Sequence, residues 1–426
     1  MKFTEKLVRI FKDRDLRKKI FFVLGLLVVF RIAAHIPVPG VDVVALRNFF
    51  ADNEILGLLN MFSGGGMTNF SIVALGIGPY ITASIIFQLL TMVVPSLEEL
   101  SKEGESGQKK INQYTRLLTL PLALIQGYSM IKLLQQSQRG IIGDLSLFDY
   151  MSTVIILMAG TMFLMWLGEL ISEKKIGNGV SLIIFAGIVS GIPTALQRTI
   201  VTFDSSQLLN IIVFLAIGVA TIAGVVYITE AQRNIPVSYA KRVRGIRMYG
   251  GFDSHLPLKV NQAGMIPIIF AISLIMFPPL VAQLAMRAQS QFIVNLSEFV
   301  IRLFQNQVFY GILYFVLVVG FTYFYTAIIF HPQQIADNLQ KQGGFVPGIR
   351  PGRQTSDYLG KISNRIMLAG AASLGIVAIL PLVIGPLTGV KSMVISGASL
   401  LIVVSVVIET VKQIESQLVM RDYDGF

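Results

Sequence analysis

Long apolar stretches, separated by short polar and basic segments, dominate the chain. A first apolar run covers roughly residues 20–36, and further runs of about 20 residues centre near residues 84, 123, 161, 188, 219, 274, 319, 375 and 401. A helix needs about 20 apolar residues to cross the hydrocarbon core of a bilayer, whereas a spanning strand has about 10 residues that alternate in polarity. The pattern therefore predicts ten transmembrane helices and excludes a β-barrel.

The composition agrees with a protein embedded in a membrane. Of 426 residues, 54% are hydrophobic and 14% are charged, where a soluble domain has about 25% charged residues. The first 19 residues are basic and amphipathic, and the apolar run behind them is longer than the core of a cleaved signal peptide. We expect a retained cytoplasmic amphipathic segment over residues 1–19, followed by the first span.

One uncharged stretch, Ile55–Leu97, leaves the number of spans open. Its 43 residues are enough for two spans, but Gly64–Gly66 and Pro79 interrupt them. With one full span, 27 Lys and Arg residues lie on the inner side and seven on the outer side, whereas a second span would turn 19 of the 27 outward. The positive-inside rule favours one span, preceded by a re-entrant half-helix at about residues 56–70 on the outer side. Both termini are then cytoplasmic.

Ten spans divide into an N-terminal half, residues 20–200, and a C-terminal half, residues 201–413, with a cytoplasmic tail at residues 414–426. Because five is an odd number, a duplicated half would be inverted in the membrane relative to the first. Two long basic loops, residues 230–262 and 331–365, belong to the C-terminal half. Inversion is inferred from this parity, since the halves share no convincing sequence identity.

Catalytic and metal-binding chemistry has few candidates in this sequence. The chain has no cysteine, and its three histidines, His35, His255 and His331, are far apart; this excludes thiolate chemistry and leaves little for a metal site. No nucleotide-binding or protease motif occurs. The net charge of +11 is divided among loops between apolar runs, so nucleic acid is not the first partner to expect. We predict no cofactor and no enzymatic activity.

Charged residues inside the predicted spans are Arg31, Glu169 and Glu409. All three lie near span ends, where a long side chain reaches the interface at little cost, so an anchoring role is the simpler interpretation. Ion-coupled transporters usually need a carboxylate at mid-membrane, and an intramembrane enzyme needs a catalytic set there. A secondary transporter of a small solute remains the alternative to a passive channel.

The two long loops also suggest a docking site. Positive-inside charge explains the sign of both loops but not their length, nor the Pro- and Gly-rich tip Gly343–Gly352 around Arg350. Such a tip holds side chains at a defined turn. An acidic protein surface or ribosomal RNA phosphates would suit the Lys and Arg side chains there.

Five motifs occur in order along essentially the whole chain: Phe62–Gly65 with Ala74–Ile77, Lys102–Gly107, Gly177–Ser181, His255–Asn261 and Phe345–Gly352. Together they resemble the SecY family of bacterial protein-conducting channels. The resemblance implies an all-α membrane protein whose ten transmembrane helices form two inverted five-helix halves, a clamshell with a central hourglass pore. Such a channel passes unfolded secretory proteins across the plasma membrane and releases transmembrane segments laterally into lipid.

The resemblance also assigns roles to residues of the pore. An aliphatic pore ring is implied at Ile77, Ile81, Val180, Ile184, Ile269 and Ile402. Val180 is smaller than the isoleucine found in the family, which would loosen the ring slightly. A plug that blocks the pore is implied at Met61, Phe62, Ser63, Gly64, Gly65, Gly66, Met67, Thr68, Asn69 and Phe70. A hydrophobic constriction blocks ions by dewetting and forms no specific bond to a passing chain.

Gate residues and partners are implied in the same way. A lateral gate, in which the second and third spans face the seventh and eighth, would include Thr82, Gln88 and Asn261. Docking of the motor ATPase SecA and of the ribosome is implied at Lys241, Arg242, Arg244, Arg247, Arg350 and Arg353. Further implied partners are the small membrane subunits SecE and SecG, signal sequences, nascent polypeptides and membrane lipids, all at the bacterial inner membrane.

Overall fold

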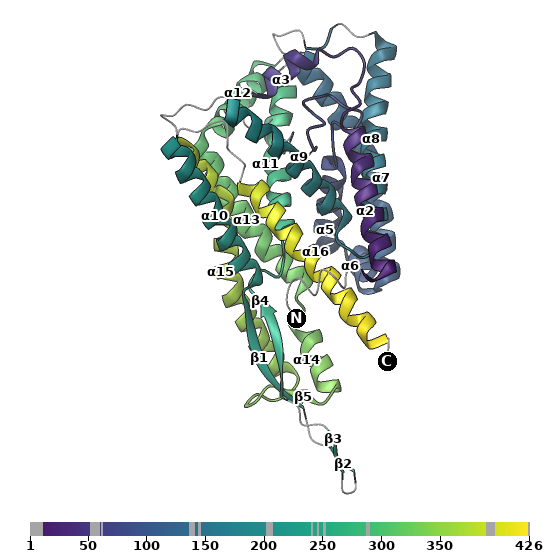
Figure 1. The fold of residues 1–426 in the computed structure, drawn as a ribbon, viewed down its shortest axis with the longest axis vertical. Helices are drawn as coiled ribbons and strands as arrows, with labels where there is room; N and C mark the ends of the chain where they lie inside the picture. The colour runs from purple at the N-terminus through teal and green to yellow at the C-terminus, as the bar shows by residue number, and fades with distance from the viewer. Residues whose placement is uncertain are drawn as a thin grey trace. The chain divides into compact units, whose positions relative to one another are not determined.

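The structure, a computed structural model, describes residues 12–51, 60, 63–135, 141–143, 146–201, 208–239, 242–244, 247–249, 253–286, 290–388 and 397–424. The chain forms two compact units. The first unit comprises Met1–Gln207, Ser273–Asn306 and Lys391–Phe426, and the second comprises Leu208–Ile272 and Gln307–Val390. Both units are mainly helical (Figure 1).

The first unit is built mainly from helices. They are α2 (Arg14–Ala33), α3 (Val43–Ala51), α5 (Gly78–Val93), α6 (Pro95–Lys102), α7 (Glu105–Gln135), α8 (Leu147–Glu173), α9 (Gly179–Val201), α12 (Gln291–Gln305) and α16 (Gly397–Asp424). Helix α7 packs between α5 and α8, and α9 packs against α8 and α16. Helix α11 (Ile266–Ala285) begins in the second unit and ends in the first.

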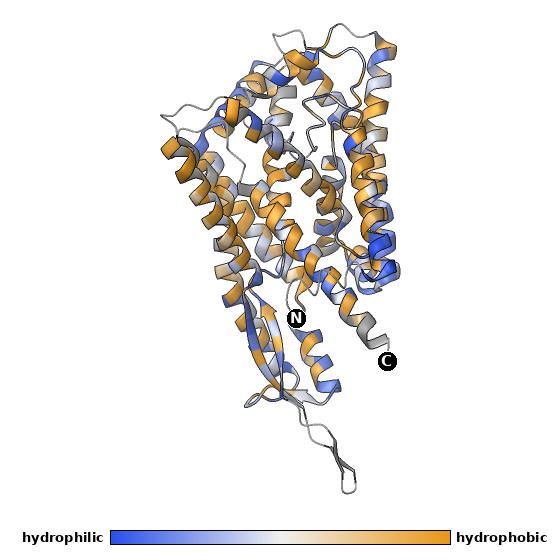
Figure 2. Ribbon diagram, viewed as in Figure 1, coloured by the Kyte–Doolittle hydropathy of each residue, from blue (hydrophilic) through white to orange (hydrophobic). Residues whose placement is uncertain are grey.

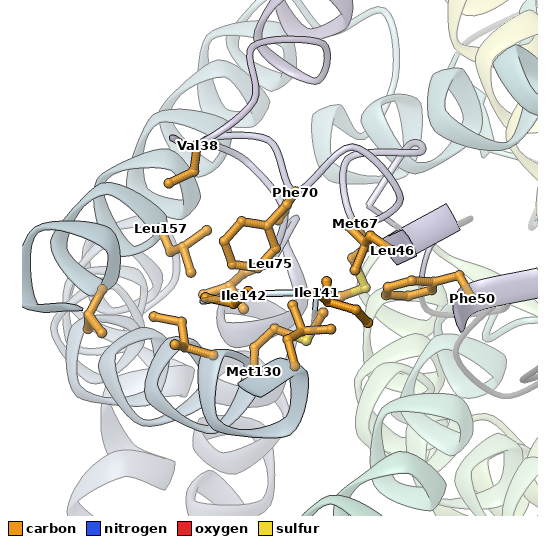
Figure 3. Packing of buried hydrophobic residues seen from close by; sticks show 14 residues of the cluster. Val38, Leu46, Phe50, Met67, Phe70, Leu75, Met130, Ile141, Ile142 and Leu157 are labelled. Atoms are coloured by element: carbon orange, nitrogen blue, oxygen red, sulfur yellow. The ribbon is translucent and has the colours of Figure 1, made fainter. Parts of the chain in front are cut away.

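The core of the first unit gathers residues from loops as well as helices (Figure 3). Phe70 and Leu75, from the turns that precede α5, pack among Met130 of α7 and Leu157 of α8. Phe70 is fully buried. Burying such a side chain contributes roughly 1.5–3 kcal/mol, so this core fixes the segment before α5 against α7 and α8.

The second unit combines three long helices with a small sheet. Its helices are α10 (Leu208–Glu230), α13 (Gln307–Ile329), α14 (Pro332–Lys341) and α15 (Arg353–Thr388). Strand β1 (Gln232–Tyr239) continues from α10, pairs antiparallel with β4 (Asp253–Lys259) on one side and pairs with β5 (Gly344–Phe345) on the other (Figure 1). Strands β2 (Arg242–Arg244) and β3 (Arg247–Tyr249) form a hairpin between β1 and β4.

The centre of each of the ten predicted apolar runs lies in a helix, namely α2, α5, α7, α8, α9, α10, α11, α13, α15 and α16. Among the described residues, five helices are long and apolar enough to cross a membrane, or six if α5 and α6, bent by 101°, count as one span. Figure 2 shows the apolar middle of α7 and α8 and the polar end of α7 next to α6. The chain is therefore a multi-pass membrane protein.

Three expectations need correction. The fold is not purely helical, because β1 alternates buried Ile235 and Val237 with exposed neighbours and pairs with β4 and β5. Of the half-helix expected at residues 56–70, residues 56–59 and 61–62 lie outside the described residues, Asn60 is helical, and residues 63–70 form turns, in which Gly64 and Gly65 adopt left-handed φ angles of 69° and 81°. The loop predicted at residues 331–365 contains α14 and the first turns of α15.

Candidate functional site

Between α3 and α5, the described residues 60 and 63–70 are joined by hydrogen bonds among themselves. The Thr68 amide donates to Asn60 Oδ1 (2.9 Å), and the Met67 amide donates to Ser63 Oγ (3.1 Å). Met67 and Phe70 are buried in the core of the first unit. Of the residues expected to form the plug, Ser63–Phe70 are therefore a compact turn structure, whereas Met61 and Phe62 lie outside the described residues.

Backbone pairing holds the end of this segment beside the chain that follows α2. The Val38 amide donates to the Phe70 carbonyl (2.9 Å), and the Ile72 amide donates to the Ile36 carbonyl (3.0 Å). These bonds satisfy backbone groups that no helix or sheet serves. They fix residues 70–72 immediately before Ile77 and Ile81 of the expected aliphatic ring.

The beginning of the segment fits against α2 and α9. A Cβ atom on Gly64 would lie 2.5 Å from Phe30 Cζ and 3.2 Å from Gly187 Cα, so no larger residue fits here without movement. The guanidinium of Arg31, in the last turn of α2, donates a hydrogen bond from Nη1 to the carbonyl oxygen of Gly64. Residue 64 is thus enclosed on three sides.

The expected ring residues come from four helices and are mostly buried. Ile77 is the N-cap residue directly before α5 and Ile81 lies in the first turn of α5, and Val180 and Ile184 lie four residues apart at the start of α9. One helical face holds residues at this spacing. Val180 is partly buried, whereas the other five, Ile77, Ile81, Ile184, Ile269 and Ile402, are at most 7% exposed.

Within the first unit, α9 packs against α16, which brings two of the helices with ring residues together. Ile269 belongs to the second unit. The ring of its neighbour Phe270 contacts the ring of Phe321 in α13 edge-on, with 5.8 Å between the ring centroids. All the ring candidates are thus aliphatic groups near helix starts or in helix interiors, none of them able to form a hydrogen bond with its side chain.

The residues expected at the gate retain unused hydrogen-bond acceptors. Gln88 donates from Nε2 to Ser84 Oγ (3.3 Å), and Asn261 donates from Nδ2 to the Gly264 carbonyl (3.1 Å). The Gln88 Oε1 and Asn261 Oδ1 atoms are buried without a partner among the described residues. Thr82 bonds back to the Gly78 carbonyl (3.1 Å). A buried acceptor without a donor is unfavourable, so both amides are suited to exchange partners.

The two long loops form one structure. Ile235 of β1, Leu258 of β4, Val346 and Leu359 of α15 pack into a common hydrophobic cluster. This contact was not expected from the sequence, because the two loops are about 100 residues apart. The alternation of Ile235 and Val237 with polar residues is the signal that could have revealed a strand.

Arg350 lies exposed at the tip of this structure. Gly348 and Gly352 adopt φ angles of 79° and 92° on either side of it, and Thr355 Oγ1 donates to the Arg350 carbonyl (2.9 Å), so the tip is fixed from within. Arg353 begins α15 and is also exposed. The remaining docking candidates belong to the β2–β3 hairpin: Arg242, Arg244 and Arg247 are strand residues, and Lys241 lies outside the described residues.

An ion pair between α7 and α8 was missed in the sequence. Arg116 Nε lies 2.6 Å from Glu169 Oε1, and both side chains are partly exposed. Glu169 was expected to anchor a span end, and its pairing with Arg116 explains how a carboxylate is accommodated in α8. Spacing along the sequence does not reveal this pair because its members are 53 residues apart.

Comparison with known proteins gives one consistent family. The family model described as SecY matches residues 71–411. A protein translocase subunit SecY from Streptomyces scabiei is 44% identical over 435 residues, with 98% of each chain covered. The same subunit from Corynebacterium glutamicum is 45% identical over 443 residues, covering 98% of this chain and 99% of the relative.

Solved structures share the fold. One described as "The structure of a protein conducting channel" superposes with a TM-score of 0.64 at 18% identity, covering 94% of this chain and 92% of the other. A second, on the plug domain of the SecY protein, has a TM-score of 0.63 at 18% identity, covering 93% and 91%. At this identity the likeness concerns the fold alone.

Proposed function

The chain belongs to the SecY family of protein translocase channel subunits, and from this premise we propose how its segments seal and open the channel. As a member of this family it is a membrane-embedded channel for protein translocation and not an enzyme. The proposed arrangement has ten transmembrane helices in two inverted five-helix halves, residues 20–200 and 201–413, around an hourglass pore. Helices in all ten predicted runs support it.

The observation that carries the proposal is the buried turn segment Ser63–Phe70 directly ahead of Ile77 and Ile81. Irregular backbone at membrane depth is tolerated only inside protein or along a cavity. A compact, internally bonded segment in that position suits a plug, and a SecY structure is described as having a plug domain that stabilises the closed state. Residues 61–70 then block the pore from outside when no substrate is present.

The pore ring proposed here consists of Ile77, Ile81, Val180, Ile184, Ile269 and Ile402. Burial of these aliphatic side chains supports a constriction that stays dry when closed. Because such side chains offer no hydrogen bond, a passing polypeptide would meet no specific site, whatever its sequence. Unfolded secretory proteins of many sequences could therefore use one channel.

Lateral release is proposed at Thr82, Gln88 and Asn261. The unpartnered amide oxygens of Gln88 and Asn261 support a seam in which polar contacts are exchanged at little cost. A signal sequence that enters this seam would replace helix contacts by its own. Transmembrane segments would leave by the same route into lipid.

Docking is proposed at the joined cytoplasmic loops, with Arg350 and Arg353 at the fixed tip and Lys241, Arg242, Arg244 and Arg247 around the hairpin. A structurally similar chain is described as Sec61 in a canine ribosome–channel complex, with a TM-score of 0.61 at 18% identity. We propose the ribosome and the SecA motor as cytosolic partners, and SecE and SecG as membrane subunits. The basic loops then face the cytoplasm of a bacterial inner membrane, as do both termini.

Single-channel conductance of the chain with its small partner subunit in planar bilayers tests the proposal. Deleting residues 61–70 should change a silent membrane into one with large, flickering ion currents. If both forms stay silent while vesicles exchange a small solute, the plug fails and the secondary transporter of a small solute replaces the channel mechanism.

A further inference from the structure

Arg31 makes a contact that anchoring at the membrane interface does not require. It lies in the last turn of α2, is partly buried, and donates from Nη1 to the carbonyl of Gly64 in the plug segment. The end of α2 has other partners: His35 Nδ1 lies 2.8 Å from the Arg31 carbonyl, and the Ala34 amide donates to the Phe30 carbonyl (3.0 Å). The guanidinium is therefore not needed to cap its own helix.

The acceptor is held in a defined place. Gly64 has φ +69°, and its α-carbon faces the ring of Phe30 and the backbone of Gly187 so closely that a Cβ would not fit. The Gly65 amide, next along the chain, donates to the Asn60 carbonyl (2.8 Å). In this geometry the Gly64 carbonyl oxygen accepts a hydrogen bond from α2, through Arg31 Nη1.

Other bonds hold the end of the segment instead of its beginning. Residues 70 and 72 pair with the backbone of residues 38 and 36, and Arg47 Nη2 donates to Asn69 Oδ1 at an exposed position (2.8 Å). Movement of residues 63–66 can leave these bonds intact. It cannot leave the bond between Arg31 and Gly64 intact.

We propose that Arg31 is the latch of the plug: its guanidinium holds the Gly64 carbonyl in the closed state, and breaking this bond is a required step of opening. The inference rests on the proposed function of residues 61–70 as the plug. A hydrogen bond from a cation to a carbonyl is stronger than a neutral one, and a cation at membrane depth needs a partner. Arg31 therefore favours the closed state until water or another acceptor replaces Gly64.

A translocating polypeptide supplies such an acceptor. Every residue of an extended chain presents a backbone carbonyl, which is the group that Arg31 binds in the plug. If a carbonyl of the polypeptide replaced the Gly64 carbonyl as the partner of Arg31, the plug would be released whatever side chains the polypeptide carries. Arg31 is thus a positioning residue, acting on the plug and through it on the conductance.

The test uses the purified translocase complex in planar bilayers. Arg31→Met removes every donor while keeping a long side chain, Arg31→Gln keeps an uncharged N–H donor group, and Arg31→Lys keeps the charge. The control is Arg302→Met, which removes an exposed arginine that pairs with Glu298 on its own helix (3.3 Å). We expect Arg31→Met to raise the resting open fraction about ten- to hundredfold, Gln and Lys to raise it less, and Arg302→Met to match the unmodified complex.

A second measurement follows the plug itself. Because the chain has no cysteine, Thr68→Cys places a single thiol in the plug segment, and its reaction with a membrane-impermeant maleimide reports exposure. Labelling at rest should become about tenfold faster or more with Arg31→Met, and be unchanged with Arg302→Met. A purely anchoring Arg31 would alter the recovery of the complex but not this rate.

Three outcomes overturn the latch and are distinguishable from one another. In the first outcome, the Arg31→Met complex shows no resting current and its Thr68→Cys thiol reacts slowly, while the complex lacking residues 61–70 conducts. Residues 61–70 are then the plug, but Arg31 does not hold it closed. If the deletion is also silent, the plug proposal fails and the latch with it. Where Arg31→Met does not yield an intact complex, Arg31→Gln and Arg31→Lys decide, and unmodified behaviour of both overturns the latch.

Discussion

At the scale of single residues, Gly64 and Gly65 separate two reasons for needing glycine. Both have left-handed φ angles, 69° and 81°, but a Cβ on Gly64 would collide with Phe30, whereas one on Gly65 meets nothing within 4 Å. Substitution to alanine costs about 1–2 kcal/mol at either position for the backbone conformation. Only at Gly64 does it also require the ring of Phe30 or the segment itself to move.

We therefore expect Gly64→Ala to open the channel at rest and Gly65→Ala to leave it closed. The measurement is resting conductance of the two variants beside the unmodified complex, with thermal unfolding in detergent to compare stability. Gly65→Ala is the matched control, because it adds the same methyl group and similar backbone strain. Equal conductance of both variants would show that the contact with Phe30 and α2 does not hold the plug.

At the scale of elements, the three-stranded sheet joins two loops that are distant in the sequence. Ile235, 1% exposed, lies at the centre of the cluster that packs β1 and β4 against Val346 and α15. Truncating a buried isoleucine to alanine typically costs about 2–5 kcal/mol. Among the helices, only α14 and the first turns of α15 contribute residues to this cluster, so the loss should be confined to the joined loops.

Limited proteolysis measures this effect. We expect Ile235→Ala to accelerate cleavage within residues 230–262 and 331–365 together, while the apolar helices stay protected by the detergent or membrane. Asn234→Ala, at the exposed neighbouring position, is the control and should cleave like the unmodified chain. Faster cleavage in only one of the two loops would contradict a shared core.

Helix α12 has three different sides. Ser297 and Phe304 are buried, and other residues of the helix form an apolar stripe and a polar side. The apolar stripe is Phe292, Leu296 and Phe299, and the polar side is Gln291, Asn295, Glu298 and Arg302. At 100° per residue these two sets lie on adjacent faces. A helix of this kind lies in the membrane surface, with its apolar stripe in lipid and its polar side in water.

Tryptophan fluorescence tests the orientation of α12. The single tryptophan, Trp166, is first replaced by phenylalanine, and then Phe299→Trp or Asn295→Trp is introduced. Brominated lipids should quench Phe299→Trp more strongly, and aqueous acrylamide should quench Asn295→Trp more strongly. Equal quenching of both by acrylamide would mean that α12 lies above the lipid.

At the scale of the whole molecule, the sequence pattern predicted those helices and turns that are determined by residues close together in the sequence. The ten apolar runs all centre on helices, even those with an internal proline such as Pro121 or Pro193, because a long apolar segment has few alternatives in lipid. The turn around Arg350 was also predictable from Gly348 and Gly352. Three features were not: the pairing of β1 with β5, the bond between Arg31 and Gly64, and the pair Arg116–Glu169. Each joins residues far apart in sequence, and no local pattern encodes such a contact.

We predict the orientation of the whole chain in the membrane from its charge. With one full span between α3 and α6, the segments predicted to be inside hold 27 Lys and Arg residues and those predicted to be outside hold seven, and a basic excess favours the cytoplasmic side for a loop. In the cysteine-free chain, a thiol at Ser254→Cys in β4 should react with an impermeant maleimide only from the cytoplasmic side. A thiol at Gln291→Cys at the start of α12 should react only from the outer side. One full span between α3 and α6 requires both results; two spans there would expose Ser254→Cys from outside and Gln291→Cys from inside, because every later loop would then change sides.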